Sequence, residues 1–465
     1  MAVLVDAEGA LGRALGRLSA RGVYADVLAE SAGGYRVRVE RGVTTAAPSP
    51  EMQGAIFRAW TGERWTETVS RSLDEVELAR AVEALDRQLG NRAGPRPPPP
   101  GDSPTGHSES STSSSRPITD VPIEDLIERA RSWHLAAVSV PGISNAFGSI
   151  AFITNERLFL SNSGARRHQS IHRVNASVLP LAIENGRVEY DPLIEGYTGG
   201  AEVLDRFTES AIHERARLSV ELLKAGAAPT GPMRVLLDPS TAGTFAHESF
   251  GHGTEADQLL RDRSYLKPLL GQMLGPDEVT LVDDGVYPGG WGSLYFDDEG
   301  FPAQRTVLVD RGRFVEVLHD RETAHALGRQ PTGNARRADF LSRTFVRMTN
   351  TYIEPGDWSF EELVQETGDG VLLERCTSGI EDPLGGQMQI KVKRARRIEH
   401  GALTTPYSSM ALSGRVLDFL RSIRGVGRKE YFEISPGLCG KGHTDLLPAG
   451  TGGTYLLSQA VVGPA

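Results

Sequence analysis

The chain has 465 residues, 39% of them hydrophobic and 24% charged, with a formal net charge of −10, so it can form two or three domains with buried cores. The acidic balance argues against nucleic acid as the main partner, because phosphate binding requires a basic face. No apolar run approaches the roughly 18 residues of a membrane span, the N-terminus lacks the pattern of a signal peptide, and two cysteines form no disulfide framework, so we expect a cytoplasmic protein.

The first 90 residues predict a small α/β layer. Apolar positions recur at helical spacing over residues 7–21, and β-type runs follow at 23–28, 35–40, 54–60 and 64–69. Ser72 and Glu75 form a capping box before a second helical pattern, which Gly90 is placed to end. Trp60 and Trp65 are expected to pack in the core rather than to face a substrate.

Residues 94–117 are rich in proline, serine, threonine and glycine. A segment of this composition cannot bury enough apolar surface to order itself, so it predicts a flexible loop or linker. His107 within this segment is expected to be a solvated side chain.

Residues 120–225 predict helices around an antiparallel sheet. Helices are expected over residues 120–132 and from Leu204 or Thr208 to Ala225. Strands are expected at residues 136–140, 149–154, 157–161, 176–184 and 187–190. Asn185-Gly186, between the last two strands, is the strongest hairpin signal in the chain.

After a predicted strand at 234–238, Pro239-Ser240 forms a turn that can cap a helix, and then His247, Glu248 and His252 follow closely. Two imidazoles and a carboxylate are the groups that hydrolytic zinc chemistry uses. The histidines are five positions apart, which puts them roughly 140° apart on a regular helix at about 100° per residue. We therefore predict a short helix that starts near Ser240 or Thr241 and widens into a π-type turn or breaks at Gly251.

Cys439 offers a third ligand, because a thiolate between glycines is accessible and Lys441 would favour the charged form. His247, His252 and Cys439 would leave one open position on a tetrahedral zinc ion, as in catalytic sites. Glu248 is then the natural general base for a zinc-bound water.

Glu255 and Asp257 follow the two histidines closely in the sequence. Each could accept a hydrogen bond from a ligand imidazole, and each could equally be a surface charge.

These residues resemble the TldD/PmbA metallopeptidase family, whose active members share an ordered set of motifs. The chain has HESFGHGTEAD from His247, YFDDEG from Tyr295, TGNARR from Thr332, RMTNTYIEPGD from Arg347 and CGKG from Cys439. The resemblance implies an α+β fold with an α/β domain over residues 1–230, in which 94–117 is an insertion. It implies a mainly antiparallel β metallopeptidase domain over residues 231–465, which carries the short metal-binding helix.

The resemblance also implies a zinc-dependent peptidase that acts on short unfolded peptides, in leader-peptide removal or in degradation of small unfolded proteins. It implies a homologous partner subunit without the metal ligands, in a closed heterodimer, although a homodimer is an alternative. A strand edge near the metal would let an extended peptide bind through main-chain hydrogen bonds.

Several other polar residues leave two interpretations open. Asp297, Asp298 and Glu299 resemble a turn with solvated carboxylates, whereas the family match suggests a role in shaping the site, without metal ligation. Asn334 and Arg336, with Arg337, could bind a peptide carbonyl or carboxylate, or form structural ion pairs.

Cys376 is expected in a core or loop, and His443, where the family often has glutamine, is expected at the surface. Two further hypotheses compete with a zinc peptidase: a non-catalytic binding or regulatory subunit of the same family, and a cysteine protease that uses Cys439 and a histidine.

Overall fold

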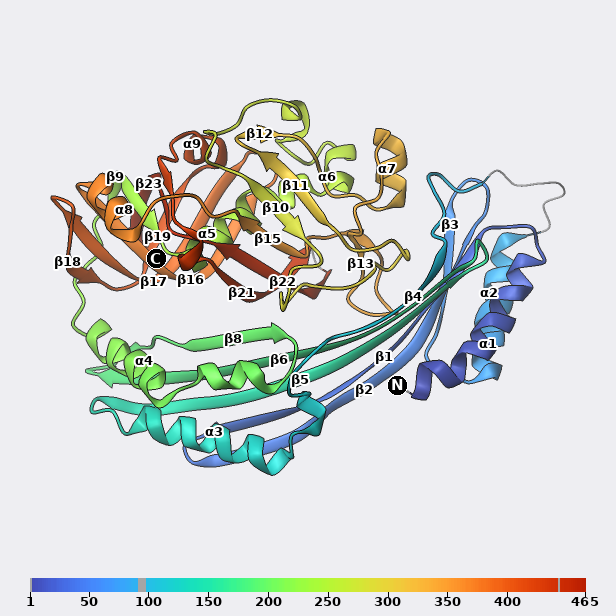
Figure 1. The fold of residues 1–465 in the computed structure, drawn as a ribbon, viewed down its shortest axis with the longest axis horizontal. Helices are drawn as coiled ribbons and strands as arrows, with labels where there is room; N and C mark the ends of the chain where they lie inside the picture. The colour runs from blue at the N-terminus through green and yellow to red at the C-terminus, as the bar shows by residue number, and fades with distance from the viewer. Residues whose placement is uncertain (1, 91–97, 442–443) are drawn as a thin grey trace.

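The computed structural model describes residues 2–90, 98–441 and 444–465. Its N-terminal part is built on one long, curved sheet that lies beneath the C-terminal part (Figure 1). The eight strands run in the order β3-β2-β1-β5-β6-β4, and β7 and β8 also pair with β6. They are β1 (Ala25–Glu40), β2 (Val43–Trp60), β3 (Trp65–Ser70), β4 (Gly106–Ser111), β5 (Ile143–Ser161), β6 (Ala165–Glu184), β7 (Arg187–Glu189) and β8 (Leu193–Thr198).

Two pairs of predicted short strands are in fact single long strands. The predicted strands at 23–28 and 35–40 belong to β1, and those at 149–154 and 157–161 belong to β5. Gly34 lies within β1 and pairs with β5 rather than forming a turn. A side chain would not fit there, because an added Cβ would be 2.0 Å from the Phe152 carbonyl oxygen. The prediction of a hairpin at Asn185-Gly186 is confirmed: both residues have positive φ and join β6 to β7.

Helices pack on the sheet at its two ends, on the side facing away from the C-terminal part (Figure 1). They are α1 (Ala2–Ser19) and α2 (Glu75–Leu89) at one end, and η1 (Ile118–Asp120), α3 (Ile123–Val138), η2 (Ala201–Arg206) and α4 (Glu209–Leu222) at the other. The four predicted helices are therefore confirmed. The strand predicted at 136–140 is wrong, because Ala137 continues the buried face of α3 after Ala130 and Trp133.

The cap of α2 also differs from the prediction. Asp74, not Ser72, accepts hydrogen bonds from the first helical N–H groups, and Ser72 binds the Asp74 carboxylate instead. Gly90 ends the helix as predicted. Trp60 and Trp65 pack edge to face with ring centroids 5.3 Å apart, which agrees with their predicted core role.

The segment predicted to be a flexible insertion contains regular structure. Residues 94–97 lie outside the described residues, but residues 106–111 form β4, an edge strand parallel to β6, with His107 exposed on it. Before β4, the Arg321 guanidinium donates to the carbonyls of Pro100 and Gly101 and to Ser103 Oγ. Backbone pairing and one buried arginine therefore order a chain that has little apolar surface to bury.

The C-terminal part contains a six-stranded sheet, a seven-stranded sheet and the two-stranded β13–β14 ribbon. Most pairs are antiparallel, and β9–β16 and β15–β22 are parallel. This arrangement confirms the predicted α+β fold with a mainly antiparallel C-terminal part.

The strands of the six-stranded sheet and the ribbon are β10 (Leu281–Asp284), β11 (Arg305–Asp310), β12 (Arg313–Phe314), β15 (Asn350–Ile353), β21 (Glu433–Lys441), β22 (Thr444–Gly453), β13 (Ala335–Arg336) and β14 (Phe345–Val346). Those of the seven-stranded sheet are β9 (Gly231–Leu237), β16 (Gly370–Asp382), β17 (Gln387–Glu399), β18 (Ala402–Tyr407), β19 (Met410–Arg415), β20 (Gly425–Val426) and β23 (Leu456–Pro464).

The helical segments of this part are short. They are α5 (Pro239–Thr244), η3 (Phe245–Gly251), η4 (His252–Thr254), α6 (Ala256–Leu260), η5 (Lys267–Leu269), α7 (Arg321–Leu327), α8 (Phe360–Thr367), α9 (Val416–Arg421) and η6 (Lys429–Tyr431). The helix α5 contacts β16 of one sheet and β22 of the other, so the start of the motif helix is held between the two sheets. Within the described residues, no helix is long and apolar enough to span a membrane.

Buried ion pairs connect the two parts of the molecule. Asp297, Asp298 and Glu299 are all buried, so the interpretation of this run as a solvated turn is wrong. Arg58 of β2 pairs with Glu299, and Arg157 of β5 pairs with Asp298. The acidic run therefore ties the C-terminal part to the long sheet.

Candidate metal centre

The helix that carries the first two candidate ligands begins at an aspartate cap. Asp238 Oδ1 accepts a hydrogen bond from the Thr241 N–H at 2.8 Å, and Pro239 occupies the first turn. The predicted start near Ser240 is thus confirmed, but the cap is Asp238 rather than the Pro239-Ser240 turn.

The same helix then widens, as the histidine spacing predicts. Residues 245–251 form the π-helix η3, in which the His252 N–H donates to the His247 carbonyl five residues earlier. A 3-10 turn follows directly at His252. The wider turn brings the two imidazoles to one side of the helix, with ring centroids 5.4 Å apart.

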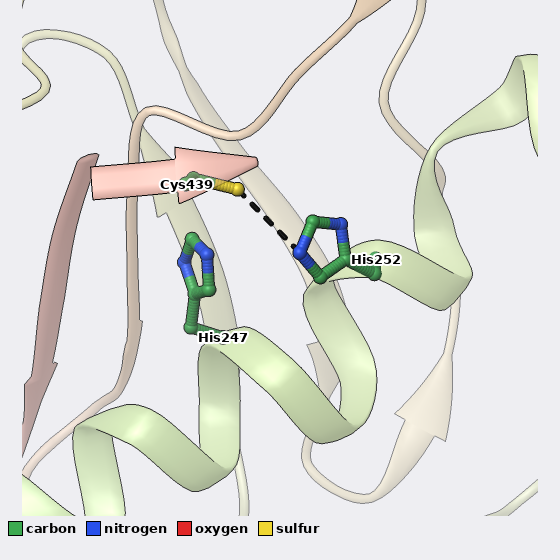
Figure 2. Close-up of side chains that lie close together, drawn as sticks. All are labelled: His247, His252 and Cys439. Carbon is green, nitrogen blue, oxygen red and sulfur yellow. Dashed lines mark hydrogen bonds between the residues drawn. The ribbon is translucent and has the colours of Figure 1, made fainter. Parts of the chain in front are cut away.

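Cys439 of β21 faces this pair of histidines (Figure 2). Its Sγ lies 3.5 Å from His252 Nε2, and one ligand atom from each of the three residues lies within 4.8 Å of the others. The structure therefore brings together the three residues that were predicted as ligands from distant parts of the sequence.

Arg347 fixes the backbone at Cys439, a contact that the sequence did not reveal. This buried guanidinium donates to the Cys439 carbonyl and lies 3.7 Å from Glu255 Oε1. Arg347 begins the RMTN motif, so the motif itself was the available signal, although its role requires knowledge of the fold.

The electrostatic environment favours a thiolate at Cys439. Burial raises the pKa of the Cys439 thiol, but the adjacent His247 and His252 lower it more, and the result lies well below the ordinary value. The histidines thus have the effect that was expected of Lys441. Lys441 Nζ instead contacts Asp257 at 2.7 Å and Glu255 at 3.0 Å.

The donor set fits a zinc ion. Two imidazole nitrogens and one thiolate are ligands that zinc prefers, and three protein ligands leave a fourth position for a reactant. His247 Nδ1 is buried and has no hydrogen-bond partner among the described residues, which is costly unless another group uses this nitrogen. A bound metal would also keep the thiolate in its charged form.

Glu255 lies where a carboxylate could orient one ligand. Its Oε2 is 3.4 Å from His252 Nδ1. Burial raises the pKa of Glu255, but Lys441 and His252 outweigh it and lower the pKa to about 2. Asp257, the other predicted orienting carboxylate, bonds to Lys441.

A cavity of about 320 Å³ opens beside the centre, and we call it the site cavity. His247 and Glu248 line it, together with residues of β16 and β21. Gly379 of β16 permits this arrangement, because a Cβ there would lie 2.6 Å from Glu248 Cγ. The sequence offered no signal for Gly379, since the contact joins two distant segments.

Asn334 and Arg336 do not line the site cavity. Both are buried, and Asn334 Nδ2 donates to Asp283 and to the Arg347 carbonyl at 2.8 and 3.0 Å. Arg336 donates to the carbonyls of Met348 and Pro448. Both side chains are therefore held by structural hydrogen bonds, and a role for them in binding substrate stays a prediction.

Of the remaining candidates, Cys376 lines the site cavity, where burial raises the pKa of its thiol to about 12 and keeps it neutral. His443 lies outside the described residues.

The chain is similar to known metalloproteases. Residues 230–461 match the model of the PmbA/TldA metallopeptidase C-terminal domain. A metalloprotease of Methanocaldococcus jannaschii is 36% identical over 351 residues, which cover 74% of this chain and 75% of the relative. A zinc metalloprotease TldD homolog of Saccharolobus solfataricus is 30% identical over 223 residues, 48% of this chain and 49% of the relative.

The fold is also similar to that of a solved structure. TldE from Thermococcus kodakarensis superposes with a TM-score of 0.75 over 98% of this chain and 100% of that chain, at 15% identity.

Proposed function

Because the chain belongs to the PmbA/TldD metallopeptidase family, we propose that it is a zinc-dependent peptidase with His247, His252 and Cys439 as metal ligands. The observation that carries this proposal is the approach of these three ligand atoms to within 4.8 Å of one another at the wall of the site cavity. We take residues 231–465 as the metallopeptidase domain and residues 1–230 as the α/β domain, in agreement with the range of the family model.

Zinc in this position would act as a Lewis acid toward the scissile carbonyl and the attacking water. Glu248 follows His247 directly and lines the same cavity, so its carboxylate is available as the general base. It takes a proton from the attacking water and passes it to the departing amine. Glu255 orients His252 through Nδ1 and favours the tautomer that leaves Nε2 free for the metal.

The substrates that we propose are short unfolded peptides, in leader-peptide removal or in degradation of small unfolded proteins. The strand β21 ends the order of the six-stranded sheet, and its residues 435–438 line the site cavity. An extended peptide can pair with such an edge through main-chain hydrogen bonds, whereas most main-chain groups of a folded protein are already paired within it.

The partner that we propose is a homologous subunit without the ligand set, in a heterodimer, with a homodimer as the alternative. The likeness of this fold to TldE supports a partner of related structure. We propose the cytoplasm as the compartment, where a metal-binding thiol such as Cys439 stays reduced.

A cysteine protease is the second candidate, because Cys439 Sγ lies within 3.5 Å of His252 Nε2 in a geometry that a thiolate–imidazolium pair could use. A cysteine protease would keep its activity in the presence of a zinc chelator, and a zinc peptidase would lose it.

Metal content and peptide cleavage test the proposal together. Elemental analysis of the purified wild type should find stoichiometric zinc, and Cys439→Ala and His252→Ala should lose both the zinc and cleavage of an unstructured peptide. Cys376→Ala is the matched control, since this second cysteine also lines the cavity but is outside the ligand set. Freshly prepared, unchelated wild type without metal would contradict the zinc site and favour a binding subunit.

A further inference from the structure

Among the residues that the structure describes, one cation that lines the site cavity has no hydrogen-bond or ion-pair partner for its charged group. Apart from His247 and Glu248, the charged side chains that line it are Arg375 and Lys393. Lys393 Nζ donates to Glu189 at 2.7 Å and lies 4.0 Å from the Tyr190 ring centroid, so its charge is compensated. The Arg375 guanidinium forms no hydrogen bond or ion pair with any residue that the structure describes.

The nearby acids are engaged elsewhere. Asp191 lies 3.7 Å from Arg215 and 3.6 Å from Arg394, and Glu374 binds Arg394 and Arg396.

Burial raises the pKa of Glu433 of β21, and the nearby charge of Arg375 offsets this rise only in part. Among the described residues, no hydrogen bond or ion pair joins the Glu433 and Arg375 side chains. Glu248 is the one acidic side chain among the described residues that line the cavity.

The position of Arg375 is fixed by the residue that also positions the metal-binding helix. Arg375 has a φ of 64°, unusual for a residue with a side chain, and it precedes an irregularity in β16. Its N–H donates to Asp238 Oδ2 at 2.9 Å, while the other oxygen of Asp238 caps α5. The Asp238 carboxylate therefore fixes the backbone of Arg375 relative to the start of α5, which leads into the segment that carries His247 and Glu248.

We propose that Arg375 binds a carboxylate of the peptide substrate inside the site cavity and selects peptides that present one there. A guanidinium is always charged and can bind a carboxylate through two parallel hydrogen bonds. Arg375 is therefore suited to bind one carboxylate at a defined position rather than to attract negative charge in general. The carboxylate can come from the peptide C-terminus or from an aspartate or glutamate side chain. The inference rests on the proposed function, because it names the substrate class of the same site.

Binding of labelled peptides separates the two sources. The probes are short unstructured peptides of alanine, serine and glycine with a free C-terminus and one glutamate, which moves along the set. Each has one counterpart with an amidated C-terminus and one with glutamine in place of glutamate. Fluorescence anisotropy is measured on the zinc-loaded full chain with Glu248→Gln, so that bound peptide is not cleaved, and this background is common to all variants.

We expect loss of one of the two carboxylates to weaken binding by about tenfold or more, because hydrogen bonds between charged groups are stronger than neutral ones. If the peptide with an amidated C-terminus binds more weakly, Arg375 binds the C-terminal carboxylate. If replacing glutamate by glutamine at one position weakens binding, Arg375 binds a side-chain carboxylate. Adding Arg375→Gln should remove that difference, and Arg375→Lys should keep part of it. Glutamine and lysine must adopt the same positive φ at position 375 as arginine does. Thermal melting then checks that the three proteins are folded to the same extent.

Arg397→Gln is the control, an arginine of β17 outside the cavity, and it should leave the discrimination unchanged. The inference is overturned if both carboxylates are dispensable in the Glu248→Gln protein, or if discrimination survives Arg375→Gln. Because this readout is binding, carboxylate-dependent binding without any cleavage by the wild type would refute the peptidase proposal and leave the Arg375 site standing.

Discussion

Glu255 is the residue at which the charges around the candidate metal centre meet. It is fully buried, and its carboxylate lies 3.4 Å from His252, 3.0 Å from Lys441 and 3.7 Å from Arg347. A buried carboxylate of this kind is stable only with its cations in place. Its contact with His252 connects it to the ligand set, and its contact with Arg347 connects it to the backbone of Cys439.

Glu255→Gln should therefore weaken zinc binding while the fold is retained. Glutamine has nearly the same shape as glutamate but lacks its charge. The charge of Glu255 orients the His252 imidazole and makes that imidazole more basic. Loss of such a partner typically reduces metal affinity by about 10- to 100-fold. Competition with a chromophoric chelator measures the zinc dissociation constant directly.

Asp257→Asn is the matched control for this substitution. Asp257 also binds Lys441, at 2.7 Å, but its hydrogen bonds go to Lys441 and not to a histidine. We expect little change in its zinc affinity. Equal losses in the two variants would mean that Lys441, rather than the contact with His252, determines zinc affinity.

At the scale of single elements, the sequence allowed local geometry to be predicted but not the contacts between distant segments. The spacing of His247 and His252, with glycines around the second, was enough to predict the π-type turn. The Asp238 cap was missed because Pro239-Ser240 looked sufficient, and Gly379 was missed because its contact with Glu248 crosses two elements.

The long strands of the sheet were missed for a related reason. β1 and β5 were each divided in two because Gly33-Gly34 and Asn155-Glu156 interrupt their apolar patterns. In the fold, Asn155 Nδ2 donates to Glu30 across the sheet, so a polar position is part of the strand rather than its end. Periodicity alone cannot detect a hydrogen bond between neighbouring strands.

The close packing of α5 against β22 gives a prediction for this element. A Cβ on Gly243 would lie 2.7 Å from both the Gly452 nitrogen and the Thr451 carbonyl carbon, which are backbone atoms that cannot move alone. Gly243→Ala should lower the free energy of unfolding by about 1–3 kcal/mol, as overpacking does. It should also reduce zinc binding, because α5 leads directly into η3. Urea unfolding and zinc titration measure the two effects.

Gly12→Ala in α1 is the control for helix propensity. A Cβ on Gly12 meets nothing within 4 Å, so this change should be neutral or stabilise the protein by up to about 1 kcal/mol. If Gly243→Ala were as well tolerated as Gly12→Ala, the contact between α5 and β22 would not be the constraint that positions the metal-binding helix.

At the scale of the whole molecule, the two parts are joined by buried charges rather than by apolar packing alone. Arg157 of β5 lies between Glu30 of its own sheet and Asp298 of the C-terminal part, with 13% of its side chain exposed. Burial lowers the pKa of Arg157, but Asp298 and Glu30 outweigh this effect and raise it. A base whose pKa is raised by folding contributes stability at every pH below its unfolded pKa, so this contribution is present throughout the working range.

Arg157→Met should leave two buried carboxylates without their cation and cost about 3–5 kcal/mol of unfolding free energy near neutral pH. A buried carboxylate without its cation is costly only while it is charged, because burial disfavours the charged form. The difference in unfolding free energy from wild type should therefore shrink between about pH 8 and about pH 5.

Urea unfolding across this pH range tests the sign as well as the size of the effect. Arg80→Met removes an exposed ion pair with Glu77 in α2 and should change stability little at any pH, since exposed pairs contribute little. A difference that stayed constant or grew toward low pH would mean that Glu30 and Asp298 find other partners when Arg157 is lost. The acidic run at 297–299 would then bind the long sheet mainly through Arg58 and Glu299, and the Arg157 pair would be dispensable for joining the two parts.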